Sequence, residues 1–371
     1  MQQKSKIFFE NLDGLRFIAF FMVFVFHIFM YFQVKDPSDT FDFIYKALSF
    51  RHKGGFYGVS FFFVLSGFLI SYLLLSELHL RGKINVAYFY MRRILRIWPL
   101  YYFVLVLGFI GLPIFMETLG HAFKETGNPW AFIFFVANFD AIRVIPSEPL
   151  GVQWSIAVEE QFYLLWPLVF RIIPRRFLLY FMLAVVNISF IFRYMHYGDY
   201  DSLGFHSLAV MNDLAIGGIA AWFAINSARV RDFFRDLPKP YIVVGYITGL
   251  VFMYCDNGVF APMSRLGLSL FFVFVILEQC YSEHSFYKMG RSKFLTYWGK
   301  YTYGLYLYHM IVIFIVFMLS PLLGIGNTYS DFIIKAVSSL IISMAVSYAS
   351  YTWFESFFLK LKHRFSYIVK S

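Results

Sequence analysis

Apolar segments of helix length recur along the whole of this 371-residue chain. An α-helix needs about 20 apolar residues to cross the hydrocarbon core of a bilayer. Only 15% of the residues are charged, against about 25% in an average soluble protein. We therefore predict an all-α, polytopic membrane helix bundle that forms one domain over residues 1–371. About ten transmembrane helices are expected, at 13–32, 56–77, 97–116, 152–170, 176–195, 205–226, 240–255, 262–281, 301–320 and 332–356.

The distribution of Lys and Arg predicts the orientation of this bundle. With ten crossings and a cytoplasmic N-terminus, the cytoplasmic segments hold 22 of the 32 basic residues, and the outside loops hold six. Basic residues favour the cytoplasmic side, so we expect a multi-pass protein of the cell inner (cytoplasmic) membrane with both termini cytoplasmic. The net charge of +10 is then mostly a topology signal, which argues against a nucleic-acid partner and leaves the lipid bilayer as the surrounding partner.

The segment 129–140, PWAFIFFVANFD, is apolar but too short to cross comfortably. A full crossing there would invert the orientation of everything after it and remove the charge asymmetry. We therefore predict a re-entrant or interfacial segment at 129–140.

The first predicted span, DGLRFIAFFMVFVFHIFMYF, carries Asp13, Arg16 and His27. Eleven residues separate Arg16 from His27, so in an α-helix both side chains point the same way, roughly 16 Å apart along the axis. A charged group inside the membrane costs about 2.5–3.5 kcal/mol on insertion scales and usually faces the protein interior. This polar face is where we look for chemistry.

The fourth predicted span, WSIAVEEQFYLLWPL, brings a carboxylate to a similar depth. His27 lies about 21 Å in from the cytoplasmic end of its span, at 1.5 Å per residue. Glu159 lies about 10 Å below the outer surface, counted from the outer end of its own span. The two residues are therefore expected at a similar depth in the membrane. A carboxylate at that level could hold the imidazole in one tautomer as an oriented base. The alternative is that Glu159 or Glu160 caps a helix or pairs with another cation.

Three arginines, Arg92, Arg93 and Arg96, lie at the predicted cytoplasmic mouth in the run YFYMRRILRIWPLYY. Guanidinium groups bind phosphate in a bidentate fork, so the cluster suits a multiply phosphorylated ligand. An ordinary topology cluster that contacts lipid headgroups explains the same spacing equally well.

Other polar residues in the predicted spans leave alternatives open. His309 is well inside the ninth span, where a lone histidine is more often a hydrogen-bonded core residue. Asp213 could pair with a span arginine such as Arg193, and Ser66 and Gly67 read mainly as small packing residues. The histidines and cysteines show no metal-ligand spacing, so we expect no metal.

Together these motifs resemble the acyltransferase-3 family of integral membrane acyltransferases. The match covers nearly the whole chain and rests on five pieces in the family's order: NLDGLRFIAFFMVFVFH, FFFVLSGFLIS, RRILRIWPLYY, WSIAVEEQFYLLWP and YGLYLYH. The resemblance implies transfer of an acyl group, usually acetyl, from cytoplasmic acyl-CoA to a hydroxyl of a cell-surface or exported carbohydrate or glycoconjugate. It also implies that Arg16 and His27 are the essential pair and that Arg92, Arg93 and Arg96 lie near the donor site.

We therefore expect acetyl-CoA as the acyl donor, His27, Arg16 and Glu159 as catalytic residues, and an association with polysaccharide biosynthesis proteins. Whether the acyl group passes through a covalent acyl-histidine stays open. Two features depart from many relatives: Phe357 stands where a proline often follows the glutamate at Glu355, and the chain stops before an esterase-like domain, as in stand-alone members.

Other functions remain to be weighed against acyl transfer. A polytopic transporter or flippase of a glycan or lipid-linked precursor also places charges on a solvated path, but usually shows repeat symmetry, and none is evident here. Acylation of a non-polysaccharide acceptor such as a secondary metabolite, or an accessory role beside a polysaccharide synthase, are further alternatives.

Overall fold

The computed structural model describes residues 9–31, 54–144, 147–254 and 261–365, and every regular element in these ranges is helical. The first half of the chain forms α1 (Glu10–Met30), α3 (Gly54–Arg81), α4 (Val86–Val106), α5 (Leu112–Thr118), α6 (Pro129–Ile133), α7 (Ala137–Ala141), α8 (Gln153–Ile172) and α9 (Arg175–Met195). The second half forms α10 (Tyr200–Phe205), α11 (Ser207–Asn226), α12 (Ala228–Asp236), α13 (Lys239–Tyr254), α14 (Ala261–Tyr281), α15 (Lys293–Gly299), α16 (Thr302–Leu319), α17 (Tyr329–Ser350) and α18 (Ser356–Lys362). Single π-helical turns connect α4 to α5 at η2 (Leu107–Gly111) and α17 to α18 at η7 (Tyr351–Glu355).

The predicted polytopic bundle is confirmed. Eight helices among the described residues are long and apolar enough to cross a membrane. The other two of the ten expected segments are also helical: α8 has 20 residues but carries Glu159 and Glu160, and α13 has only 16 residues. The protein is thus a multi-pass membrane protein, with α8 placing two carboxylates inside the bundle.

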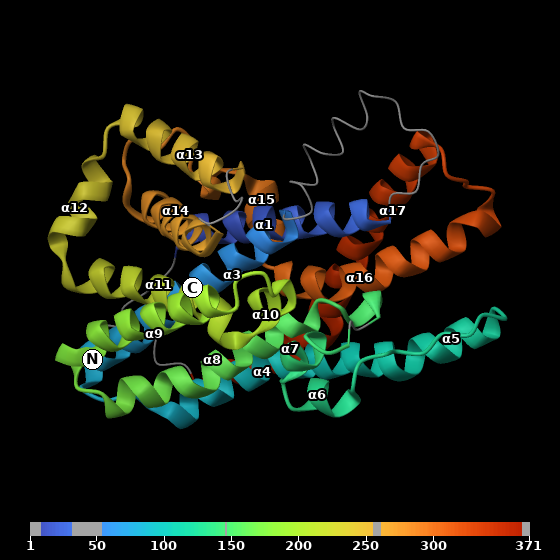
Figure 1. Cartoon of the computed structure of the whole chain (residues 1–371), viewed down its shortest axis with the longest axis horizontal. Coiled ribbons are helices and arrows are strands. Elements are labelled where there is room, and N and C mark those ends of the chain that lie inside the picture. The colour runs from blue at the N-terminus through green and yellow to red at the C-terminus, as the bar shows by residue number, and fades with distance from the viewer. Residues whose placement is uncertain (1–8, 32–53, 145–146, 255–260, 366–371) are drawn as a thin grey trace.

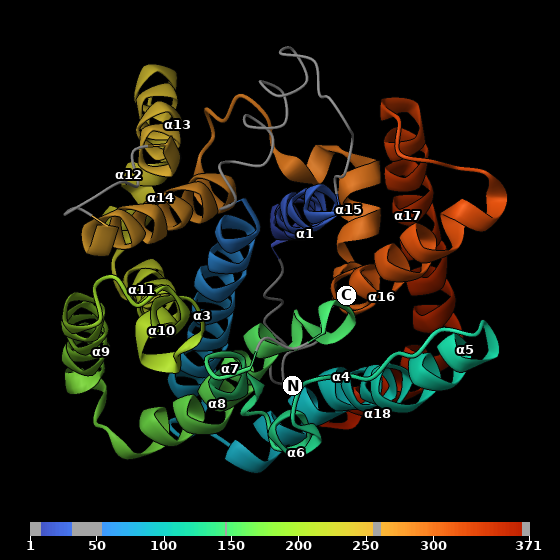
Figure 2. The ribbon, with the colours of Figure 1, turned by 45° about the vertical axis from the view of Figure 1, so that its right-hand side comes forward.

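Helices α1 and α3 lie in the middle of the bundle (Figures 1 and 2). Figure 2 shows α9 to α14 on one side of this pair and α15 to α17 on the other, with α4, α8 and α18 across from α1. Because α1 and α3 are surrounded by other helices, the polar side chains that they carry can face protein rather than lipid.

The segment 129–140 does not cross the membrane. It folds into α6 and the start of α7, which have five residues each and are separated by a turn at Phe135 with a φ of 55°. Tyr101 of α4 donates a hydrogen bond to the carbonyl of Phe132, and Gln161 of α8 donates one to that of Phe135. Gln161 thus satisfies the carbonyl of Phe135, whereas Tyr101 adds a second donor to that of Phe132, which also accepts from the backbone N–H of Phe135.

Helices α3 and α11 approach each other closely at two glycines. A Cβ added at Gly67 would lie 1.9 Å from the carbonyl oxygen of Leu214, and one added at Gly217 would lie 2.0 Å from that of Val64. Backbone meets backbone here, as at the small-residue interfaces typical of membrane helices. The predicted packing role of Gly67 is confirmed.

We expect Gly67→Ala to lower the melting temperature in detergent, because the methyl group would force two backbones apart. Overpacking typically costs about 1–3 kcal/mol, and backbone atoms cannot move aside as side chains can. Gly111→Ala is the matched control, because a Cβ there makes only ordinary contacts, with Leu107 Cδ2 at 3.5 Å and the carbonyl oxygen of Val106 at 3.9 Å. Equal melting temperatures for the two variants, measured by thermal unfolding, would contradict the close approach.

Candidate functional site

Helix α1 presents its polar and aromatic residues to the interior as the sequence predicts. Arg16 and Asp13 form an ion pair one turn apart near the N-terminal end of the helix. Further along, the rings of Phe20 and Phe24 lie against His309 of α16, with centroid distances of 5.6 and 6.5 Å. The face that α1 turns toward α16 therefore includes His27, and Tyr31 just past the helix end also packs on α16, with its ring 5.0 Å from that of Phe317.

His27 is hydrogen-bonded to a second histidine. Its Nδ1 lies 3.0 Å from Nε2 of His309, whose side chain is 0% exposed. Nδ1 of His309 lies 2.7 Å from the carbonyl oxygen of Tyr306 and 3.2 Å from that of Leu305, both in α16. The two imidazoles form a connected pair, the His27–His309 pair, anchored to the backbone of α16.

The expected contact between Glu159 and His27 is not the one that the structure shows. Glu159 accepts hydrogen bonds from Ser66 of α3 and from Tyr163 of its own helix, each at 2.8 Å. Both of its oxygens are occupied in this way, and the partner of His27 is His309 instead. Glu159 lies inside the bundle, as its predicted depth implies. The rotation of α8, however, turns its carboxylate toward Ser66 of α3.

Glu159 belongs to a second group of polar residues, the Arg96 cluster, formed by Arg16, Arg96, Glu159, Tyr163 and Glu355. Arg96 is close enough to interact electrostatically with Arg16, Glu159 and Glu355. These residues come from α1, α4, α8 and η7, so four segments distant in the sequence meet here. Of the predicted site residues, Arg16 and Glu159 are thus each within electrostatic range of Arg96.

Glu355 lies in this cluster although its sequence context departs from the family pattern. It is 7% exposed, occupies the π-helical turn η7 and accepts a hydrogen bond from Ser350 at 3.2 Å. Single π-helical turns are frequent at functional sites. The turn directs the carboxylate inward at the point where α17 passes into α18.

The other two arginines of the predicted donor site have different surroundings. Arg92 donates a hydrogen bond to the carbonyl of Phe365 at 2.8 Å and lies 3.6 Å from the carboxylate of Glu77. The guanidinium of Arg93 lies over the rings of Phe89 and Tyr163, at 5.7 and 5.3 Å. Arg93 therefore contacts the Arg96 cluster through Tyr163, whereas Arg92 contacts Glu77 and Phe365, which lie outside it.

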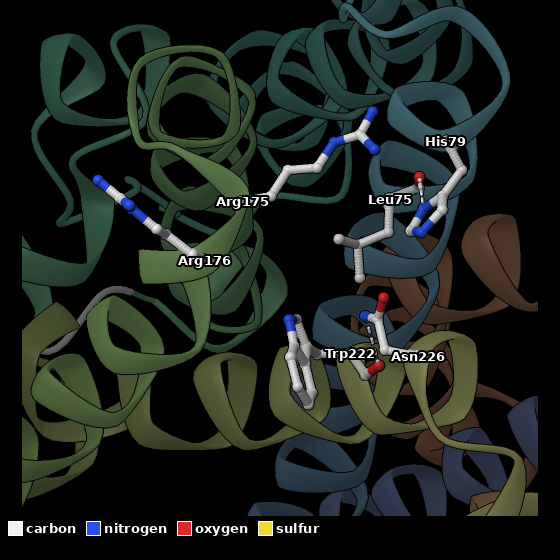
Figure 3. A pocket seen from close by; sticks show the side chains of 6 residues that line it. All are labelled: Leu75, His79, Arg175, Arg176, Trp222 and Asn226. Atoms are coloured by element: carbon white, nitrogen blue, oxygen red, sulfur yellow. Dashed lines mark hydrogen bonds between the residues drawn. The ribbon is translucent and has the colours of Figure 1, made fainter.

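A separate pocket of about 220 Å³ opens where α3, α9 and α11 end or begin (Figure 3). It is lined by Leu75, His79, Arg175, Arg176, Trp222 and Asn226. Arg175 reaches toward α3, where it donates a hydrogen bond to the carbonyl of Leu78, and Arg176 points the other way. Leu75 is nine residues further along α3 than Ser66, so this pocket is distinct from the interior site.

Asp213 forms a buried network of its own. Arg265 of α14 donates hydrogen bonds to both carboxylate oxygens, at 2.6 and 3.3 Å, and Ser269 donates one at 2.6 Å. The suggested partner Arg193 instead donates to the carbonyls of Leu203 and Ala209. The expectation of a pair with Arg193 is therefore corrected to Arg265.

Breaking the Asp213 network should destabilise the protein strongly. Asp213→Ala leaves the Arg265 charge buried without its counterion, a change that typically costs about 3–5 kcal/mol. Asp232→Ala is the control, because its ion pair with Arg235 is exposed and such pairs are worth about 0–1 kcal/mol. Thermal unfolding should show a large drop for Asp213→Ala alone; equal drops would mean that the buried pair contributes no more than a surface pair.

Among the described residues, no three His, Cys, Asp or Glu side chains are close enough to hold a metal ion. The chemistry that the interior residues can supply is that of two imidazoles, carboxylates and guanidinium groups. An imidazole with a fixed partner suits proton transfer, and paired guanidinium groups suit an anionic ligand or leaving group.

Sequence comparison identifies the family of this membrane helix bundle with its interior histidines and arginines. A family model described as an acyltransferase domain matches residues 9–352, so the chain belongs to this acyltransferase family.

Curated relatives share the bundle but are longer. The chain is 28% identical over 338 residues to the O-acetyltransferase OatA of Staphylococcus aureus, which covers 84% of this chain and 52% of that protein. It is 33% identical over 171 residues to the peptidoglycan O-acetyltransferase OatA of Listeria monocytogenes, which covers 44% of this chain and 24% of that protein. The chain thus spans about half the length of the Staphylococcus relative. No solved structure matches it.

Proposed function

We propose that this protein is a membrane O-acetyltransferase that moves an acetyl group from acetyl-CoA to a hydroxyl of a carbohydrate or glycoconjugate. The observation that carries the proposal is the His27–His309 pair inside a bundle of the acyltransferase family. Acetyl transfer is favoured because the relatives are named O-acetyltransferases. A carbohydrate acceptor is favoured because the Listeria relative is named a peptidoglycan O-acetyltransferase. The whole bundle acts as one domain in this proposal.

In this mechanism His27 is the general base. It takes the proton from the acceptor hydroxyl as the oxygen attacks the thioester carbonyl. The carbon–sulfur bond then breaks, the ester is formed, and the proton leaves His27 for the thiolate, giving free CoA. Glu159 is assigned to the Arg96 cluster rather than to the base, since its oxygens are held by Ser66 and Tyr163.

The Arg96 cluster is assigned to the donor. Arg16 and Arg96 carry positive charge toward the interior, where they would attract the anionic CoA while its thioester reaches His27, which protonates the departing thiolate. Arg92 and Arg93 lie on the same helix as Arg96 and would bind the CoA phosphates. The excess of basic residues in the predicted cytoplasmic segments supports an orientation with both termini in the cytoplasm, where acyl-CoA is found.

Loss of the base should abolish transfer without unfolding the protein. We expect His27→Ala to lower the rate of labelled acetyl transfer in membranes by about 10²–10⁴-fold, the usual contribution of a general base. His284→Ala, which removes an exposed histidine between α14 and α15, should retain wild-type activity. Wild-type rates in His27→Ala, at equal amounts of folded protein, would refute the base assignment.

The donor assignment makes a separate prediction. Arg92→Ala and Arg96→Ala should each raise the KM for acetyl-CoA about 10–100-fold, since a hydrogen bond to a charged group contributes about 1.5–3 kcal/mol. Arg235→Ala, which removes an arginine that forms surface ion pairs with Asp232 and Asp236, is the matched control. Release of free thiol at varied acetyl-CoA concentrations measures the effect, and an unchanged KM in both cluster variants would remove these arginines from the donor site.

A further inference from the structure

The protonation pattern of the His27–His309 pair can be worked out from its acceptors. Nδ1 of His309 lies 2.7 Å from the carbonyl oxygen of Tyr306 and 3.2 Å from that of Leu305. A carbonyl oxygen only accepts hydrogen bonds, so Nδ1 of His309 must carry a proton. A neutral imidazole has one N–H, and Nε2 of His309 is therefore an acceptor.

This assignment fixes the proton of His27 as well. Its Nδ1, 3.0 Å from Nε2 of His309, must be the donor, because two lone pairs at that distance would repel.

Packing holds the two rings in this arrangement. His309 is enclosed by Phe20, whose ring meets it edge-on at 5.6 Å, and by Tyr306 at 5.8 Å. Phe26 lies edge-on to His27 at 5.1 Å. Because His309 is fully buried and bonded to its own helix, it can serve as a fixed acceptor for a ring on α1.

We propose that His309 is a positioning residue that fixes His27 in the tautomer with an unprotonated Nε2. Nε2 is then the nitrogen that takes the proton of the acceptor hydroxyl, and the N–H···N bond to His309 persists after the transfer. His309 thus takes the place that a carboxylate holds in many His-containing triads, but it is neutral. It fixes the orientation and the tautomer of the His27 ring without adding a negative charge to the interior. The catalytic consequence rests on the proposed function, whereas the tautomer does not.

Nitrogen-15 NMR of histidine-labelled protein in lipid vesicles tests the tautomer directly. His27→Gln and His309→Gln assign the resonances of the two rings. We expect His27 to be protonated at Nδ1 and not at Nε2, with a correlation across the hydrogen bond to Nε2 of His309. A wild-type His27 protonated at Nε2 overturns the proposal, whether or not the protein transfers acetyl groups.

Two variants test the positioning role in the reaction. His309→Phe keeps a ring in the pocket but removes the acceptor, and His309→Gln keeps an acceptor oxygen at a similar reach. We expect His309→Phe to lower kcat about 10²-fold, the cost of a misplaced reacting group, with the KM for acetyl-CoA unchanged. His309→Gln should recover most of kcat.

The outcomes separate this proposal from the general function. Wild-type kcat in His309→Phe, or equal losses in the Phe and Gln variants, would overturn the positioning role. If the wild-type protein transfers no acetyl group, the proposed function fails and the NMR result alone decides the tautomer.

Discussion

The structure depends on the cost of placing polar groups inside an apolar bundle. An ionisable side chain in the membrane interior needs a partner, and three pairs in the described interior meet this need separately. Asp13 pairs with Arg16, Asp213 with Arg265, and His27 with His309. Each pair joins neighbouring turns or helices, so satisfying the polar groups also fixes how the helices are rotated against one another.

Two of the polar groups include residues of α1, one near each end of the helix. The Arg96 cluster gathers near Arg16, and the His27–His309 pair lies roughly 16 Å further along the helix. In the proposed function the first group receives the donor and the second activates the acceptor. Separating the charged residues from the base has a chemical advantage, since the imidazoles stay among aromatic rings while the guanidinium groups have carboxylates beside them.

The helices could be predicted well from the sequence, because a helix that crosses the membrane needs about 20 apolar residues in a row. The sequence also predicted that 129–140 does not cross and that Arg16 and His27 lie on one helix. It did not predict which residues pair. Counted from the cytoplasmic ends of their predicted spans, His309 lies about 12 Å deep and His27 about 21 Å deep. Their predicted depths therefore gave no reason to expect that the two histidines form a pair. Tilt and rotation are set by packing between helices, and neither Arg265 nor Ser66 carried a sequence signal for its partner.

The central claim is that this bundle itself passes an acetyl group from CoA on one side to a carbohydrate hydroxyl on the other. Purified protein in sealed vesicles, with labelled acetyl-CoA outside and an oligosaccharide enclosed, tests it most directly. The account predicts labelled oligosaccharide inside while CoA appears outside, for the molecules inserted with the Arg96 cluster facing out. Label that never reaches the enclosed oligosaccharide, although acetyl-CoA is present outside and the protein is folded, would contradict it.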